Sequence, residues 1–228
     1  VIQKGMAPAG SRRLPPLAKV GLALVVLAML AALFWRSVHT ARSAPYTLSP
    51  DTRGAWRLSI EMSSRPNDPV LVLTPPSGYA RELFDQVFKR SMESMAAPDT
   101  GGMPLVLQGE LERAGSERIT PDALLAMARE AGLEEVIPTP RCLAHRRAPE
   151  PDTREQVFFA TYDDPAFKTF RWNLAARLGA KFEADFVTPL LLIGTVQSPA
   201  HRWLPLEVDE AKDCVAPIVQ QAGAGAGS

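Results

Sequence analysis

Residues 20–35 read VGLALVVLAMLAALFW, from Val20 to Trp35, and these sixteen residues include no charged side chain. A helix of this length rises about 24 Å, slightly less than the roughly 30 Å of a hydrocarbon core. Two more apolar residues extend the run if Lys19 lifts its ammonium group to the lipid headgroups. Trp35 followed by Arg36 is typical of an interfacial anchor. We therefore predict a transmembrane helix over residues 17–36, anchored by Lys19 and Val20 at one end and by Trp35 and Arg36 at the other.

Two other interpretations of this run were weighed. A buried core helix is usually amphipathic, whereas this run is apolar on every face. A cleaved signal peptide has an apolar region of about 7–15 residues followed by small residues at the cut. The best cleavage candidate downstream, Ala44, has Arg42 three residues before it and Pro45 directly after it. The sequence favours an anchor that is retained.

The basic residues around the run indicate its orientation. Four precede or open it and two follow it closely, in this order: Lys4, Arg12, Arg13 and Lys19, then Arg36 and Arg42. Because positive flanks stay in the cytoplasm, we expect the N-terminus there and the main domain in the periplasm, with the helix in a bacterial inner membrane. Residues 37–228 hold 20 basic and 25 acidic side chains, a net charge of −5. This balance argues against nucleic acid as a partner.

The rest of the chain is expected to form one domain. We predict a cytoplasmic tail over 1–16, a linker over 37–55, a folded domain over 56–221 and a flexible tail over 222–228. A domain of this size can bury a core of its own. The 21 proline residues are expected to divide it into short elements.

Apolar periodicity predicts strands that alternate with helices. The expected strands are Trp56–Met62, Val70–Leu73, Met103–Leu107, Val136–Ile137, Gln156–Tyr162, Leu190–Val196 and His201–Val208. The expected helices are Tyr79–Met92, Pro121–Ala131, Pro165–Leu178 and Asp209–Gln221. Residues 108–118 are expected to be a strand end and a turn, and 144–152 an exposed loop. This alternation favours an α/β fold, with α+β as the other option, built as a sandwich around one mixed sheet.

Helix start signals are the clearest local features of the domain. Thr120 is an N-cap candidate before Pro121, and Asp164 is one before Pro165. Gly132 fits the position that follows a helix C-terminus.

The two cysteines, Cys142 and Cys214, lie far apart in the sequence and match no CxxC or zinc-ribbon spacing. In an oxidising compartment they are allowed to form a disulfide, and two buried free thiols are the alternative. With His145 and His201 they could in principle complete a zinc site, and Cys142 with a histidine could form a nucleophile pair. Nothing in the spacing requires either, so we expect structural cysteines.

Other candidates for chemistry have plainer interpretations. The pair Asp163-Asp164 could serve a metal or acid–base chemistry, but its place before Pro165 favours helix capping. Residues 74–78, TPPSG, could present N–H groups to an anion, but they lack the glycine spacing and lysine of a phosphate loop. We therefore expect no catalytic residue, no metal and no cofactor.

Trp172 lies two residues after Phe170, roughly opposite it on a helix, and is expected to be exposed as a contact for a partner. The favoured function is a single-pass accessory subunit of a larger membrane complex for energy transduction, secretion or the envelope. Its partners would be the lipid bilayer and other subunits. The alternative is a membrane-tethered periplasmic enzyme or small-molecule-binding domain with a pocket at the strand ends.

Overall fold

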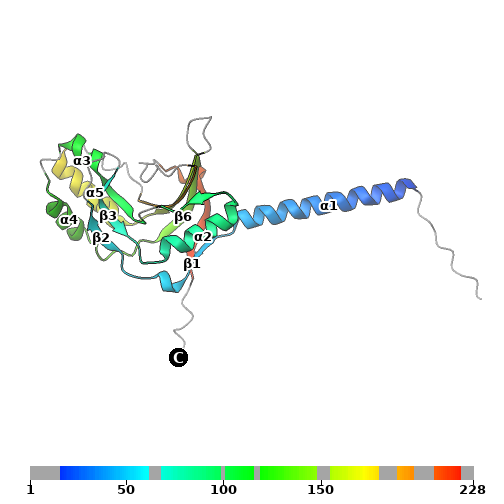
Figure 1. The fold of residues 1–228 in the computed structure, drawn as a ribbon, viewed down its shortest axis with the longest axis horizontal. Helices are drawn as coiled ribbons and strands as arrows, with labels where there is room; N and C mark the ends of the chain where they lie inside the picture. The colour runs from blue at the N-terminus through cyan, green and yellow to red at the C-terminus, as the bar shows by residue number, and fades with distance from the viewer. Residues whose placement is uncertain are drawn as a thin grey trace, which may run out of the picture. The chain divides into compact units, whose positions relative to one another are not determined.

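The computed structural model describes residues 16–61, 68–98, 101–115, 119–147, 155–179, 189–197 and 208–221. The chain divides into two compact units, Val1–Ala41 and Arg42–Ser228. The α/β fold class expected from the sequence is confirmed, with the strands divided between a large mixed sheet and a small second sheet (Figure 1). The predicted tails, apart from Pro16, and the predicted strand over 201–208, apart from Val208, lie outside the described residues.

The first unit consists mainly of helix α1, which runs from Pro16 to Ser43 and is longer than the predicted span. Within it, Val20–Ser37 is long and apolar enough to cross a membrane. None of this window is buried in the protein. Between Val20 and Trp35, exposed apolar side chains lie on every face of the helix, as the sequence predicts.

The large sheet has six strands in the order β1-β9-β6-β7-β8-β4. Their bounds are β1 Tyr46–Leu48, β4 Met95–Ala96, β6 Pro140–Arg147, β7 Gln156–Tyr162, β8 Leu190–Val196 and β9 Cys214–Gln220. β1 pairs with β9 in parallel, and the other neighbours are antiparallel. The first and last strands of the domain are therefore side by side.

The small sheet has the antiparallel order β2-β3-β5. These strands are Arg57–Ile60, Pro69–Thr74 and Met103–Leu107. Gly102 lets β5 approach β3, because a Cβ atom there would lie 2.2 Å from Cγ1 of Val72.

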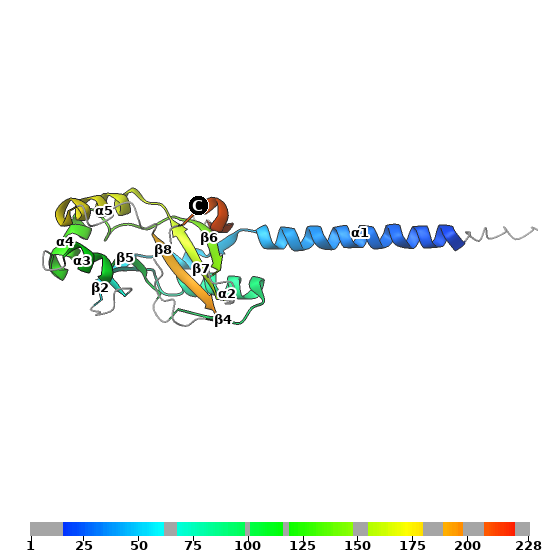
Figure 2. The same ribbon diagram turned by 90° about the horizontal axis from the view of Figure 1, so that it is seen from above.

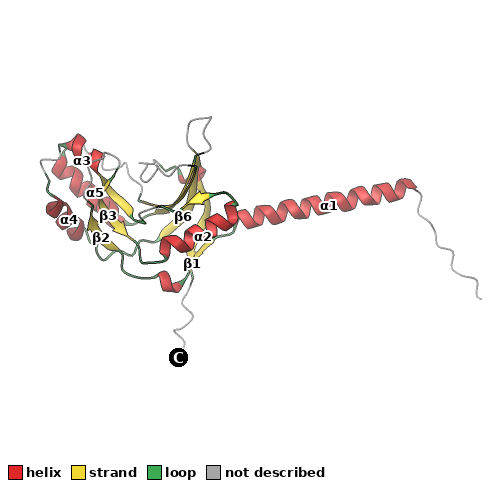
Figure 3. Cartoon of the chain, viewed as in Figure 1, coloured by secondary structure: helices red, strands yellow, loops and turns green. Residues whose placement is uncertain are grey.

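Helices lie at several places around the two sheets (Figures 2 and 3). They are η1 Pro50–Thr52, α2 Tyr79–Ser91, α3 Gln108–Ala114, α4 Pro121–Glu130, α5 Pro165–Leu178 and α6 Glu210–Asp213. α3 packs on β5, and α4 packs on β2, β3 and α5, so these helices cover the small sheet. α2 packs on β1 and β8 of the large sheet.

The central strands of the large sheet are buried on both faces. Along β7, Phe158 and Ala160 belong to the main core, whereas Val157 and Phe159 belong to a second apolar cluster on the opposite face. Burial on both sides explains the apolar runs at 157–160 in β7 and 190–194 in β8.

Several local predictions were wrong. Residues 108–114 form α3, because the Glu110 carboxylate accepts a hydrogen bond from the Leu107 N–H at 2.8 Å, the N3-to-N-cap contact that starts a helix. Residues 144–147, expected in an exposed loop, complete β6, and Val136–Ile137 is not a strand. The predicted helix over 209–221 is the short α6 followed by β9, which is held by pairing with β6 and β1.

The segment expected to be a linker, 37–55, is also ordered differently from the prediction. α1 continues to Ser43, β1 begins at Tyr46 and η1 covers Pro50–Thr52. The domain's sheet therefore starts three residues after α1 ends.

Candidate functional site

One face of α2 holds the segment that follows α1. Glu82, Gln86 and Arg90 are spaced four residues apart, so they lie on one side of the helix. Gln86 donates from Nε2 to the carbonyl oxygen of Thr47 at 2.6 Å, and its Oε1 accepts from the Thr47 N–H at 3.0 Å. A side-chain amide thus makes the two bonds that a neighbouring strand would make to β1.

The other two side chains continue this contact in both directions. Glu82 accepts from the Ser49 N–H at 3.0 Å and from the Ser49 hydroxyl at 3.0 Å. Arg90 donates to the carbonyl oxygens of Ala44 and Pro45, the latter at 2.8 Å. Together the three side chains bind the backbone of residues 44–49, which we call the entry segment.

Arg90 also covers the first aromatic residue of the entry segment. Its Cζ atom lies 4.0 Å from the centre of the Tyr46 ring, a cation–π arrangement. Burial raises the pKa of Tyr46, and the positive charge of Arg90 opposes part of that rise.

The entry segment is thus fixed on both sides. β1 pairs with β9 along one edge, and α2 satisfies backbone groups along the other. Sequence reasoning missed this site because it treated 37–55 as a linker. The available signals were the strand-forming residues of Tyr46–Leu48 and the regular spacing of Glu82, Gln86 and Arg90.

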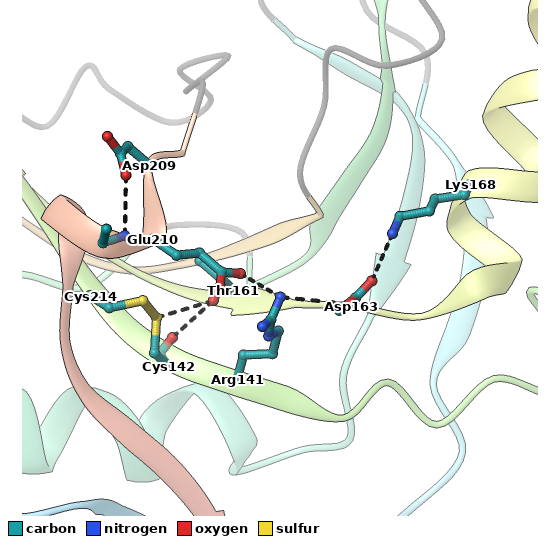
Figure 4. Close-up of polar contacts among 9 residues, drawn as sticks. Arg141, Cys142, Thr161, Asp163, Lys168, Asp209, Glu210 and Cys214 are labelled. Carbon is teal, nitrogen blue, oxygen red and sulfur yellow. Dashed lines mark hydrogen bonds and ion pairs between the residues drawn. A yellow bond between two sulfur atoms is a disulfide. The ribbon is translucent and has the colours of Figure 1, made fainter.

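A disulfide links two strands of the large sheet. The sulfur atoms of Cys142 in β6 and Cys214 in β9 are bonded, and their Cα atoms lie 5.8 Å apart. Figure 4 shows Thr161 of β7 beside this bond, with Oγ1 3.3 Å from the Cys142 sulfur. Sulfurs in a disulfide are not thiolates, so this state offers neither the proposed zinc ligands nor a nucleophile.

His145, one of the two histidines of the zinc hypothesis, makes contacts of another kind. His145 stacks on Phe158 with ring centres 4.6 Å apart, and its Nε2 lies 2.7 Å from Oε1 of Gln156. His201 lies outside the described residues. The part of the chain that the structure describes contains no group of three or more His, Cys, Asp or Glu side chains placed to hold a metal.

The acidic pair before α5 has the capping role that its position predicts. The Asp164 carboxylate accepts a hydrogen bond from the Ala166 N–H at 2.9 Å. Asp163 lies 3.6 Å from Arg141 and 3.3 Å from Lys168, and Arg141 also pairs with Glu210 at 2.8 Å (Figure 4). These side chains are about half exposed or more, apart from Glu210 at 37%, so the network is a surface ion-pair cluster.

The TPPSG segment forms a turn. Tyr79 donates its N–H to the carbonyl of Pro76 at 3.2 Å, and Gly78 adopts a left-handed φ of 86° at the start of α2. The glycine is required because other residues rarely adopt this backbone.

A small cavity lies between β5 and α5. It is lined by Pro104, Leu105, Phe167, Phe170, Arg171 and Pro189. Arg171 donates to the Leu105 carbonyl at 3.3 Å and to the Glu110 carboxylate at 2.8 Å. The charged side chain at the cavity is thus engaged with the fold, and the other lining residues are apolar.

Trp172 and three of the predicted anchor residues are exposed. Trp172 on α5 is 65% exposed, and Val20 and Trp35 on α1 are 59% and 72% exposed. Arg36 is exposed on the same helix, and Lys19 lies in its first turns.

No protein-family model, curated protein or solved structure matches this chain.

Proposed function

We propose that this protein is a single-pass membrane protein whose α/β domain serves as an accessory subunit of a larger membrane assembly. The observation that carries the proposal is the unburied apolar window Val20–Ser37 in α1. Its eighteen residues rise about 27 Å, which fits a hydrocarbon core. Apolar surface of this extent is favourable only when lipid or protein covers it.

The sidedness of the domain is argued from charge and from cysteine chemistry. More basic residues precede the window than follow it, which favours a cytoplasmic N-terminus and a periplasmic domain. A disulfide between Cys142 and Cys214 persists in an oxidising compartment and is rare in a cytosol, so it supports the same orientation.

The accessory role is argued from the way the domain is attached. The entry segment is bound to α2 and β9, so the domain begins almost directly after the helix without a free tether. A short attachment keeps the domain near the bilayer, where it can meet other subunits. Exposed Trp172 is the side chain best suited to such a contact, because tryptophan is enriched at interface centres.

The membrane part of the proposal is tested with the full chain in bacterial membranes. We expect the chain to stay in the pellet after alkaline carbonate extraction, at full length, and to be digested by protease from the periplasmic side. The double substitution Leu27→Arg/Leu30→Arg should release it, because each arginine costs about 2.5–3.5 kcal/mol at the centre of a span. Leu27→Ile/Leu30→Ile is the matched control and should stay in the membrane.

The accessory role has its own readout. After gentle detergent extraction, the chain should migrate with partner subunits in a particle much larger than its own 24.8 kDa. A shortened soluble product would contradict the anchor, and a lone small particle would contradict the accessory role while leaving the anchor intact. The latter result would favour a tethered enzyme or binding domain.

A further inference from the structure

The C-terminal end of α2 carries exposed apolar side chains. Phe88 is 47% exposed and Met92, one turn later, is 91% exposed, the highest value among the large apolar side chains in the described ranges. Phe88 stacks on Phe84 with ring centres 6.1 Å apart. Met92 ends the helix with a left-handed φ of 56°, a backbone that is uncommon for residues other than glycine.

This apolar pair is close to the point where the chain leaves the anchor. Arg90 lies between Phe88 and Met92 in the sequence, and it donates to the carbonyls of Ala44 and Pro45. Ala44 directly follows Ser43, the last residue of α1. Phe88 and Met92 are each two residues from Arg90, so their Cα atoms lie within about 7 Å of its own.

The length of α1 sets the height of this point above the lipid. Between the end of the apolar window at Ser37 and the end of α1 at Ser43, six helical residues rise about 9 Å. The headgroup layer on each side of a bilayer is roughly 5–8 Å thick. Ala44 therefore lies at the outer limit of the headgroups when α1 spans the bilayer, whichever way the domain leans.

The chemistry of this surface suits lipid headgroups. Lys89 is exposed between the two apolar side chains, and Arg90 is next to it. The neighbouring acids are engaged: Asp85 pairs with Arg81 at 3.0 Å, and Glu93 accepts from Gln156 at 3.0 Å. Bulky apolar side chains beside lysine and arginine are typical of segments that lie in the membrane interface.

We propose that the C-terminal end of α2 rests on the membrane surface, with Phe88 and Met92 inserted among the lipid headgroups. This inference rests on the proposed function, because it requires α1 to span the bilayer. The contact gives the domain a second attachment to the membrane besides its anchor, and so fixes which of its faces is turned away from the lipid.

The test measures quenching by lipid in vesicles of phosphatidylcholine and phosphatidylglycerol that contain the full chain. Both native cysteines are in a disulfide, so an introduced cysteine can be labelled without reductant. We expect a fluorescent label on Met92→Cys or Phe88→Cys to lose emission when the lipids carry quenchers in the headgroup or shallow acyl positions. The matched control is Trp172→Cys, an exposed position on α5, where the loss should be several-fold smaller.

A third label separates the two proposals. On Leu27→Cys, deep acyl quenchers should reduce emission strongly, which reports that α1 spans the bilayer. If this label is unaffected, the proposed anchor fails. If it is quenched while labels at 88 and 92 behave like the label at 172, the surface contact alone is overturned. Photo-crosslinking of position 92 to a protein in native membranes, without quenching in vesicles, would assign the surface to a protein partner and overturn the lipid contact.

Discussion

Arg171 in α5 donates a hydrogen bond to the carboxylate of Glu110 in α3 at 2.8 Å, and both side chains are buried. Glu110 also accepts from the Leu107 N–H at 2.8 Å, so one carboxylate both starts α3 and joins it to α5. A buried charge is costly unless it is paired, which makes this contact sensitive to loss of either member.

Removing one partner of this pair should destabilise the domain strongly. We expect Glu110→Ala to lower the free energy of unfolding by about 3–5 kcal/mol, because it leaves the Arg171 charge buried without its carboxylate. Urea unfolding of the detergent-solubilised full chain measures the change. The double substitution Glu110→Leu/Arg171→Met should cost less than Glu110→Ala alone, and a larger cost for the double variant would contradict the argument.

The amide of Gln86 should control the order of the entry segment. Gln86→Leu keeps a similar size but removes the hydrogen bonds between the amide and Thr47, so we expect a loss of about 1–3 kcal/mol and faster hydrogen exchange at the Thr47 amide. Hydrogen exchange with mass spectrometry reports on residues 44–49. Asp85→Asn, which breaks only an exposed pair with Arg81 on the same helix, is the control and should leave the exchange unchanged. If hydrogen exchange at residues 44–49 is as slow in Gln86→Leu as in Asp85→Asn, the Gln86 amide does not hold β1.

Reduction of the disulfide should weaken the domain without a change of sequence. The bond between Cys142 and Cys214 closes a long loop, and its loss typically costs about 2–5 kcal/mol. We expect reductant to lower the urea midpoint of the full chain. The variant Cys142→Ala/Cys214→Ala should unfold at one midpoint with or without reductant. An unreduced wild-type chain with that same low midpoint would contradict a stabilising role.

Two buried tyrosines should make the domain sensitive to alkaline pH. The hydroxyl of Tyr162 donates to that of Tyr79 at 3.1 Å, and burial raises the pKa of both residues above the usual value of 10.0. Above about pH 10 the unfolded chain loses these protons while the folded chain keeps them, so stability falls as pH rises. Below pH 10 both states hold the protons and the effect is absent.

The alkaline effect is measured as the unfolding free energy at pH 8, 10 and 11. The variant Tyr79→Phe/Tyr162→Phe keeps the rings that pack edge-on against Trp56 but cannot ionise. We expect its stability to fall less steeply above pH 10 than that of the wild-type chain. Identical slopes would show that these hydroxyls do not carry the effect.

The sequence by itself determined the features that depend on neighbouring residues. The apolar run of α1 needs only composition and length, and the starts of α4 and α5 need only a capping side chain before proline. Thr120 and Asp164 accept the expected N–H bonds at 3.2 and 2.9 Å. The apolar runs at 157–160 in β7 and 190–194 in β8 are typical of strands buried on both faces, because alternate side chains pack on opposite faces of a strand.

The tertiary structure alone decided the features that depend on distant pairing. Residues 214–220 show no clear hydrophobic period. They form β9 because they pair with β1 on one side and with β6 on the other. The same holds for the entry segment, in which Thr47 is bonded to Gln86 across 39 positions of sequence. Buried backbone groups need hydrogen-bond partners, and the local sequence does not show which distant side chain will supply them. The way the domain holds the segment after α1 is therefore a property of the folded chain, although the apolar run of α1 can be identified from sixteen consecutive residues.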